Sequence, residues 1–233
     1  MAAKTNLLLV PGLLCSRALW GPQLAGLGDI ADITVADHTR HDTMEGIARS
    51  ILAAAPDRFA LAGLSMGGYI SYEIVRQAPD RVMKLALLDT GSRADAPERR
   101  AGRLELQALA EREGARKAQE KLLPVLIHTG RLTDKPLVEA VLQMADDIGV
   151  EGFKRQLAAI MARPDNRPLL ASIRCPTLVV VGQEDVLTPP DLSREIAAGI
   201  PGARLEIVAD CGHLSTMERP EAVNRLLRTW LTG

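Results

Sequence analysis

Residues 63–67 read Gly-Leu-Ser-Met-Gly and place Ser65 at the centre of a G-x-S-x-G motif. A β-like run, Arg58–Ala62, precedes the motif, and a helical pattern, Tyr69–Gln77, follows it. When a strand turns straight into a helix, the residue at the apex is held in strained backbone geometry with its side chain above the sheet. Backbone then approaches the positions two before and two after the apex, so both require glycine. The pattern predicts that Ser65 is a nucleophile; a glycine-rich turn with an incidental serine is the less favoured interpretation.

A nucleophilic serine needs a base and a carboxylate that orients the base. Of the four histidines, His213 lies in a glycine-containing loop directly after a strand-like run, so it can reach the end of the sheet where Ser65 emerges. Thr177–Gly182 is a predicted buried strand that leads to Asp185. The order serine, aspartate, histidine along the chain fits a strand–turn–helix nucleophile site. Asp89, at the end of the strand after the motif, is the alternative acid, and we favour Asp185.

Together these segments resemble the α/β-hydrolase family, and the resemblance covers nearly the whole chain. Residues 7–16, Leu-Leu-Leu-Val-Pro-Gly-Leu-Leu-Cys-Ser, resemble the family's oxyanion loop; residues 174–185 are similar to its acid-bearing strand, and Cys-Gly-His at 211–213 to its histidine loop. The most similar group comprises small esterases, enol-lactonases and cofactor-free haloperoxidases. Family members usually carry His-Gly before the oxyanion loop, where this chain has Pro-Gly at 11–12. That change keeps the backbone donor but removes a side chain that often supports the loop.

The resemblance implies a mechanism and a role for five residues. His213 would take the proton from Ser65 as the serine attacks an ester carbonyl, while Asp185 fixes the imidazole tautomer. Water activated by the same histidine would then release the acyl group. The backbone N–H groups of Leu13 and Met66 are expected to hold the oxyanion. Their side chains are expected to shape an apolar acyl site together with Leu14, Trp20, Leu187 and Leu214.

The expected function is hydrolysis of small carboxylic esters or lactones, as by a carboxylesterase or lactonase. The same residues can also serve acyl transfer, perhydrolysis or lyase chemistry, and the sequence does not separate these reactions. Some proteins of this fold bind small molecules without catalysis, which we favour less because a receptor need not keep an activated serine. No metal-ligand cluster, dinucleotide-binding glycine motif or phosphate loop occurs in the sequence, so we expect no metal and no cofactor.

Composition agrees with one enzyme domain. A chain of 233 residues is long enough to bury a stable core, and a formal net charge of −1 does not favour nucleic acid or an anionic membrane as a partner. The three cysteines, at positions 15, 175 and 211, do not suggest a disulfide framework. The first residues lack a signal-peptide pattern, and no apolar run approaches a membrane span. We therefore expect a cytoplasmic location; the oligomeric state stays open.

Apolar runs that alternate with helical patterns predict a parallel sheet covered on both faces. The predicted strands are 6–10, 30–36, 58–62, 84–89, 177–182 and 204–209, and the predicted helices between them are 17–27, 43–54, 65–77, 191–198 and 220–231. The first strand already leads into the oxyanion loop. We therefore expect the two N-terminal strands usual in the family to be absent, which leaves a minimal sheet of about six parallel strands.

Residues 92–171 interrupt this alternation with helical patterns at 96–113, 115–126, 135–148 and 150–162. The resemblance implies that this segment is a helical cap over the site, with residues 1–91 and 172–233 forming the α/β-hydrolase core. Arginine and glutamate are frequent between positions 93 and 103. A solvated helix face and a clamp for a substrate anion are the two interpretations, and we favour the solvated face. His128 can line the pocket, although a packing role is the more common one for such a residue.

Overall fold

In the computed structural model, which describes residues 4–233, the chain forms a parallel sheet of six strands. The strands are β1 (Thr5–Val10), β2 (Ala31–Val35), β3 (Phe59–Leu64), β4 (Val82–Leu88), β5 (Thr177–Gly182) and β6 (Arg204–Val208). Their order across the sheet is β2-β1-β3-β4-β5-β6, and every neighbouring pair is parallel. The carboxyl ends of all the strands therefore meet at one edge, which is where open α/β sheets bind ligands.

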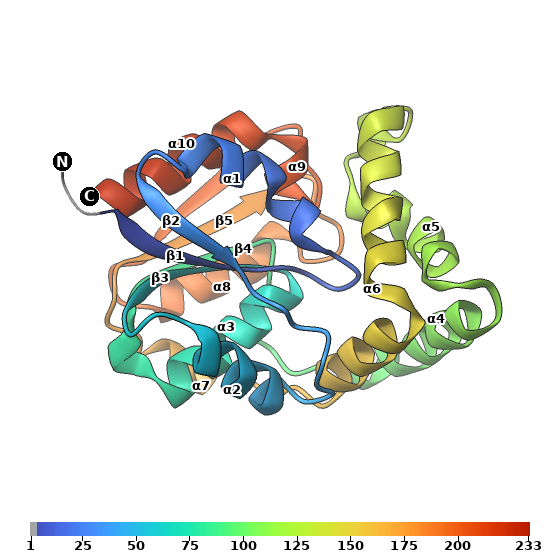
Figure 1. Ribbon diagram of the computed structural model, residues 1–233, viewed down its shortest axis with the longest axis horizontal. Helices are drawn as coiled ribbons and strands as arrows, with labels where there is room; N and C mark the ends of the chain where they lie inside the picture. The colour runs from blue at the N-terminus through green and yellow to red at the C-terminus, as the bar shows by residue number, and fades with distance from the viewer. Residues whose placement is uncertain (1–3) are drawn as a thin grey trace.

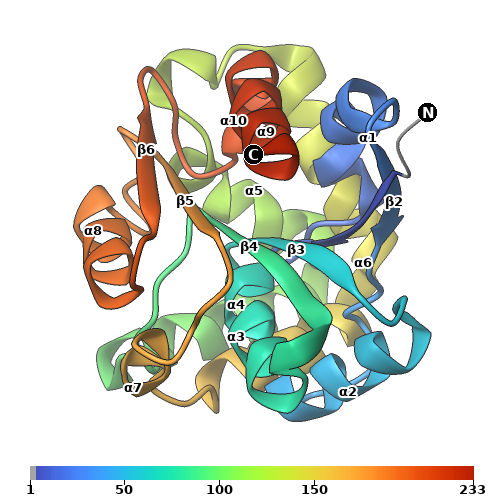
Figure 2. The same cartoon turned by 90° about the vertical axis from the view of Figure 1, so that its left-hand side faces the viewer.

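The side chains of each strand alternate between two hydrophobic clusters, one on each face of the sheet. Leu7 and Leu9 of β1 pack in a cluster with α1 (Gly21–Leu27) and α10 (Pro220–Thr232). Leu8 and Val10 pack on the opposite face, against the helices α2 (Met44–Ala54), α3 (Met66–Gln77) and α8 (Pro190–Gly199). Figures 1 and 2 show the resulting three layers, with α1 and α10 on one side of the sheet and α2, α3 and α8 on the other.

The predicted fold class is confirmed: a six-stranded parallel sheet with helices on both faces. The strand bounds differ from the predicted ones by at most two residues, and those of β5 are identical. For example, β3 continues to Leu64 because Gly63 and Leu64 still pair with Leu87 and Leu88 of β4. The predicted helix 17–27 is a short 3₁₀ turn, η1 (Arg17–Trp20), followed by α1. Residues 1–3 of the predicted core segment 1–91 lie outside the described residues.

Between β4 and β5 lies a helical insertion, residues 92–171, built mainly from α4 (Arg100–Glu113), α5 (Ala115–Leu126) and α6 (Lys135–Met161). Gly114 joins α4 to α5 at a φ of 94°, a backbone conformation that favours glycine. The two helices predicted at 135–148 and 150–162 form the single element α6, which is kinked at Gly149 with a φ of 69°. Figure 1 shows the three helices standing to one side of the sheet rather than against its faces.

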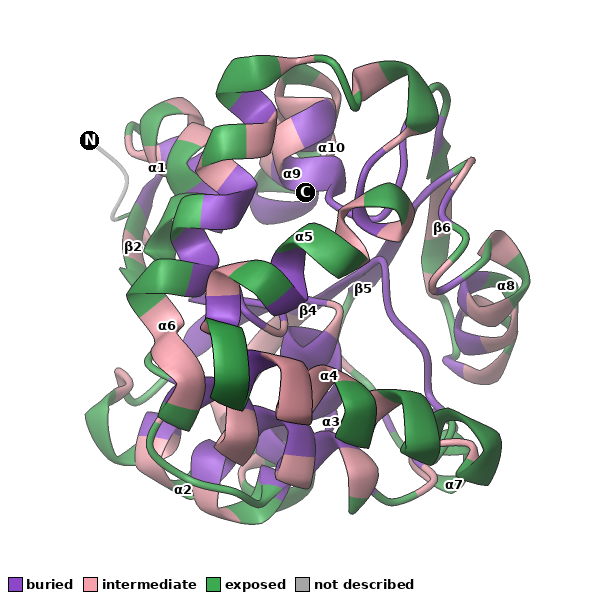
Figure 3. Ribbon diagram, turned by 90° about the vertical axis from the view of Figure 1, so that its right-hand side faces the viewer, coloured by how far each residue is buried: buried purple, intermediate pink, exposed green. Residues whose placement is uncertain are grey.

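The insertion is fastened to the rest of the chain by polar contacts. Ser16 Oγ donates a 2.8 Å hydrogen bond to Asp147 on α6, and Arg155 Nε donates one of 2.7 Å to the carbonyl of Thr39. Figure 3, coloured by burial, shows that the side of α4, α5 and α6 turned toward the viewer is largely exposed, whereas buried residues lie behind it. These helices therefore turn one surface to solvent and the other to the carboxyl ends of the strands.

The remaining short elements are η2 (Pro79–Arg81), η3 (Pro97–Arg99), η4 (Thr129–Arg131), α7 (Arg167–Leu170) and α9 (Ser215–Glu218). Across residues 4–233, no helix combines the length and the apolar character that crossing a bilayer would require.

Candidate active site

Ser65 lies between the end of β3 and the start of α3, with φ 55° and ψ −114°. A side chain at positive φ is strained by about 1–3 kcal/mol, so the surrounding structure must hold it there. The backbone N–H of Ser65 donates to the carbonyl of Leu88 at 2.9 Å, and Thr90 Oγ1 donates to the carbonyl of Ser65 at 2.8 Å. These two hydrogen bonds, to the end of β4 and from the segment after it, hold the turn on both sides of the serine.

The glycines around Ser65 are required by close backbone contacts. A Cβ at Gly63 would lie 2.2 Å from the carbonyl oxygen of Gly67, and a Cβ at Gly67 would lie 2.1 Å from that of Val10. A Cβ at Gly68 would lie 2.4 Å from Thr90 Oγ1. Each distance is far below van der Waals contact, so a side chain at any of the three positions would displace β1, α3 or the segment after β4. The motif thus reflects the packing of the turn, as predicted from the sequence.

His213 and Asp185 come from the loops after β6 and β5, and their side chains are in contact. His213 Nδ1 lies 2.8 Å from Asp185 Oδ2, and both side chains are buried. The carboxylate also accepts hydrogen bonds from the backbone N–H groups of Leu187 and Thr188, each at 2.9 Å, and from Thr188 Oγ1 at 2.7 Å. Asp185 is therefore held by the loop that carries it, with one oxygen directed at the imidazole.

The pKa shifts of this pair follow from their contact. Burial by itself would lower the pKa of His213, but the charge and hydrogen bond of Asp185 outweigh burial and raise the pKa above 6.5. Burial likewise opposes ionisation of Asp185, and its interactions with His213 and Thr188 hold the carboxyl pKa below its usual range. The pair therefore favours an ionised carboxylate that stabilises an imidazolium.

Asp89, the alternative acid, has different partners. Its Oδ1 accepts a 2.9 Å hydrogen bond from the backbone N–H of Gly182, and its Oδ2 is hydrogen-bonded to Ser215 Oγ. Burial, followed by the nearby charge of Asp185, raises the pKa of Asp89 to about 8. A carboxyl group with that pKa is mostly protonated at neutral pH. The geometry therefore favours Asp185 over Asp89 as the partner of His213.

The histidine loop packs on the helical insertion. The carbonyl oxygen of Leu126, the last residue of α5, accepts hydrogen bonds from the N–H groups of His213 and Leu214, both at 3.1 Å. A Cβ at Gly212 would lie 2.5 Å from the backbone nitrogen of His128. His128 itself donates its backbone N–H to Glu218 and does not line the cavity described below. The position of His213 thus depends on α5 as well as on the core.

The backbone N–H groups of Leu13 and Met66 are the predicted oxyanion donors. Within residues 4–233, neither backbone N–H donates to another protein group, so both are free to bind a ligand oxygen. The following residue, Leu14, has a φ of 54°, and its N–H donates to Gln156 Oε1 on α6 at 3.0 Å. This contact ties the loop that carries Leu13 to the helical insertion.

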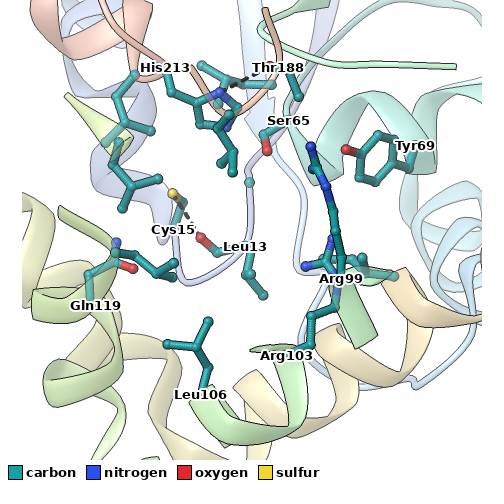
Figure 4. Close-up of a pocket in the computed structure, with 17 residues that line it drawn as sticks. Leu13, Cys15, Ser65, Tyr69, Arg99, Arg103, Leu106, Gln119, Thr188 and His213 are labelled. Carbon is teal, nitrogen blue, oxygen red and sulfur yellow. Dashed lines mark hydrogen bonds between the residues drawn. The ribbon is translucent and has the colours of Figure 1, made fainter. Parts of the chain in front are cut away.

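A cavity of about 70 Å³ is bordered by Ser65, His213 and Leu13. Most of its remaining wall is apolar, from Gly12, Leu13, Cys15, Leu64, Leu106, Leu122, Leu126, Ile160, Leu187 and Leu214, and its polar wall residues are Tyr69, Arg99, Arg103, Gln119 and Thr188. Figure 4 shows Ser65 below His213, with Tyr69 and the two arginines on one side and Gln119 on the other. The cavity is much smaller than the roughly 300–1,000 Å³ pockets that hold drug-sized ligands.

Most of the chain matches the model of a known family. A model of the family described as "Alpha/beta hydrolase family" matches residues 6–226. The chain belongs to the α/β-hydrolase family.

Similar proteins include an esterase, an enol-lactonase and a protein named as a carbamate hydrolase. A thermophilic esterase from Thermogutta terrifontis is 31% identical, with a TM-score of 0.90 over 100% of this chain and 91% of its own. The enol-lactonase from Burkholderia xenovorans LB400 is 26% identical, with a TM-score of 0.89 over 100% of this chain and 93% of its own. A protein from Serratia proteamaculans with the provisional name carbamate hydrolase RutD is 29% identical over 97% of this chain and 90% of its own. The predicted resemblance is therefore confirmed at the level of the family and of hydrolases.

Three of the side chains predicted to shape the acyl site of this α/β-hydrolase do not border the cavity. Leu14 packs with Phe153 and Leu157 of α6, and Trp20 packs with the α1 and α10 side of the core. The side chain of Met66 packs with the α2 and α3 side. Leu14 adopts a φ of 54°, and its side chain is fully buried in the cluster on α6. Leu13, Leu187 and Leu214 do line the cavity, as predicted.

Cys15 also borders the cavity but is not suited to act as a nucleophile. Its Sγ donates to the carbonyl of Leu13 at 3.3 Å, and burial raises the pKa of the thiol to about 12. The reactive form of cysteine is the thiolate, which this environment disfavours. Sequence analysis did not identify Tyr69, Arg99, Arg103, Gln119 or Thr188 as site residues. Of these residues, only Arg99 and Arg103 lie in a segment for which an anion clamp was considered, and we favoured a solvated helix face there.

Proposed function

We propose that this protein is a serine hydrolase that cleaves carboxylic esters or lactones of small acyl groups through an acyl-enzyme on Ser65. The observation that carries the proposal is the 2.8 Å contact of His213 Nδ1 with Asp185 beside a cavity that Ser65 and His213 both border. Nucleophile, base and orienting carboxylate are the three groups that acyl transfer to serine requires.

In the acylation step, Ser65 Oγ attacks the carbonyl carbon while Nε2 of His213 takes its proton. The charge that appears on the imidazole is stabilised by Asp185, which also keeps the Nδ1 proton in place. The negative charge on the carbonyl oxygen is held by the N–H groups of Leu13 and Met66. The imidazolium then protonates the leaving alcohol, and the C–O bond of the ester breaks.

In the deacylation step, water attacks the ester formed on Ser65. His213 takes a proton from this water, and the same two N–H groups hold the second oxyanion. Collapse of the intermediate returns the proton to Ser65 Oγ and releases the carboxylic acid. No metal or cofactor takes part in these steps.

We further propose that the helical insertion acts as a cap over this site. Leu106 of α4 and Leu122 of α5 border the cavity opposite the strand ends. A cap formed by these helices would exclude bulk water from the oxyanion, which strengthens the hydrogen bonds of its N–H donors. It would also limit the size of the acyl group.

We prefer esters and lactones among the possible substrates because the two solved structures named above are an esterase and an enol-lactonase. Carbamate hydrolysis, the reaction in the provisional name of one relative, passes through the same kind of carbonyl intermediate. Acyl transfer and perhydrolysis differ only in the acceptor that attacks the acyl-enzyme. A substrate screen with water as the sole acceptor, repeated with added alcohol or peroxide, separates these reactions.

The proposal is tested by covalent labelling and by Ser65→Ala. A fluorophosphonate probe should add one adduct to Ser65, identified by peptide mass, and hydrolysis of a short p-nitrophenyl ester should fall at least about 10³-fold in Ser65→Ala. Ser172→Ala, which changes an exposed serine far along the chain, is the matched control and should keep full activity. A Ser65→Ala protein that retains more than a few per cent of the wild-type kcat, with contamination excluded, would refute the nucleophile.

A further inference from the structure

Two arginines enter the cavity wall from the start of the helical insertion. Arg99 is the last residue of η3, and Arg103 lies in the first turn of α4. Residues four apart in a helical segment share one face, and both arginines border the same cavity as Ser65. Among the residues that line this cavity, within the part of the chain the structure describes, none carries a carboxylate. The cavity is therefore lined by positive charge at one end.

Neighbouring acidic groups do not neutralise this charge. Asp95 accepts hydrogen bonds from Arg103 Nε at 2.8 Å and Arg103 Nη2 at 2.7 Å, and a third from Arg163 Nη1 at 2.8 Å. One carboxylate is thus shared by two guanidinium groups. Across residues 4–233, Arg99 has no acidic partner within ion-pair distance. Three arginines and one aspartate leave two positive charges at this end of the cavity.

Asp95 holds Arg103 and Arg163 in place. Asp95 and Arg163 are buried, and the Arg163 guanidinium lies 4.3 Å from the centre of the Tyr69 ring, which itself borders the cavity. Arg163 Nε also donates to the carbonyl of Arg93 at 3.1 Å. Burial opposes ionisation of Asp95, but Arg103 and Arg163 outweigh it and lower the carboxyl pKa, so the charges persist at neutral pH. Arg103 is therefore positioned before any ligand binds.

Gln119, at the opposite end of the cavity, gives an independent sign of a polar ligand. The side chain is fully buried, and within residues 4–233 its Oε1 has no hydrogen-bond partner. Its Nε2 lies 3.5 Å from the carbonyl of Val141, at the limit of hydrogen bonding. A buried carbonyl without a partner costs about 1–3 kcal/mol. Figure 4 shows the Gln119 amide turned toward the cavity.

We propose that the substrate carries a carboxylate, which Arg99 and Arg103 bind while Ser65 attacks a nearby ester or lactone carbonyl. The inference rests on the proposed function and names its substrate class. The apolar wall between the arginines and Ser65, which includes Leu13 and Leu106, fits a short aliphatic spacer between the two groups. The carboxylate is bound and not consumed, so hydrolysis still adds one water and yields an acid and an alcohol.

The kinetic test compares esters that differ in one charge. The p-nitrophenyl hemiester of glutaric acid carries a carboxylate at the end of its acyl chain, and p-nitrophenyl valerate is its neutral counterpart. A second pair, 4-acetoxybutyrate and butyl acetate, places the carboxylate on the leaving alcohol. We expect wild-type kcat/KM to be at least about 10-fold higher for the anionic member of one pair, with a preference that declines as salt is added.

Substitution of the arginines should remove this preference. Arg99→Gln and Arg103→Gln should each lower kcat/KM for the preferred anionic ester about 10- to 100-fold, mainly through KM, and change the neutral ester less than about 3-fold. Arg100→Gln is the matched control, because Arg100 is adjacent in sequence and exposed like Arg99 but is absent from the cavity wall. Arg103→Gln also removes a partner of Asp95, so its melting temperature is measured; Arg99→Gln has no such partner to lose.

A binding measurement makes the inference independent of turnover. In Ser65→Ala protein, glutarate at millimolar concentration should raise the melting temperature, whereas the neutral glutaramide should not, and Arg99→Gln should abolish the effect. Equal turnover of charged and neutral esters in both pairs, with no glutarate effect, would overturn the carboxylate proposal and leave the serine hydrolase intact. Glutarate binding without any ester turnover or fluorophosphonate labelling would instead refute the proposed function and support the anion site.

Discussion

His38 Nε2 lies 2.9 Å from the carbonyl oxygen of Gly12, in the loop that carries the Leu13 N–H donor. The same nitrogen lies 3.0 Å from Gln156 Nε2. Because a carbonyl only accepts and an amide nitrogen only donates, His38 Nε2 can bond to just one of them in a given tautomer. Burial lowers the pKa of His38, so the ring is neutral. Through Gly12 or through Gln156, His38 thus contacts the loop that is predicted to hold the oxyanion, from the segment after β2.

His38→Ala should therefore impair catalysis through the oxyanion loop. We expect kcat to fall about 10-fold with little change in KM, since one hydrogen bond to a positioned loop is worth about 1 kcal/mol and the oxyanion forms only in the transition state. His38→Gln, which keeps a side-chain donor, should recover part of the loss, and His41→Ala, an exposed neighbour, should have no effect. Steady-state kinetics of the three variants decide between this role and packing alone, which would leave kcat of the folded protein unchanged.

Asp185→Asn should reduce kcat far more than Asp89→Asn. The first change favours the wrong tautomer of His213, and losses on the order of 10⁴ are expected for such a substitution. The second replaces a carboxyl whose pKa is raised to about 8 by a neutral amide of the same shape, so the charge at pH 7 hardly changes. Parallel kcat measurements at pH 7 test the order. The reverse ranking would assign the acid to Asp89.

The pH dependence of kcat/KM should report the titration of His213. Because Asp185 raises the pKa of His213 above 6.5 against the effect of burial, the base is protonated and inactive below that pKa. Activity should therefore rise with pH through a midpoint above 6.5. Loss of the carboxylate charge in Asp185→Asn should move this midpoint to lower pH. A wild-type midpoint clearly below 6 would be incompatible with the contact seen between the two side chains.

Neutral p-nitrophenyl esters should show an optimum at short chain length. Each methylene buried against the leucines of the cavity contributes roughly 0.8 kcal/mol, so kcat/KM should rise over the first few carbons. A cavity of about 70 Å³ fills quickly, after which longer chains must displace α4 or α5. The series from acetate to laurate measures this limit. Continued improvement to twelve carbons would indicate an open, lipase-like site instead of a capped one.

Local sequence patterns were sufficient for the strand–turn–helix around Ser65 and for the parallel sheet. Gly63 and Gly67 have no room for a side chain because backbone of the same turn and of the neighbouring strand β1 lies against them. A short apolar run is best buried as a strand of a parallel sheet that helices cover on both faces. The candidates Asp185 and His213 follow from the same logic, since each stands just beyond a strand whose carboxyl end must lie at the common edge of the sheet.

Which residues line the cavity depends on the tertiary structure alone. Helical periodicity predicts which residues of α4 share a face, but not which of them reach the strand ends. Arg99 is exposed, as the predicted solvated face requires, and it borders the cavity together with the half-buried Arg103. Leu14, Trp20 and Met66 do not border the cavity, because each side chain is buried in one of the three hydrophobic clusters. The support of Gly12 by His38 joins segments 26 residues apart that nothing in their own sequences connects. Such contacts depend on how whole elements pack, and packing is a property of the assembled chain.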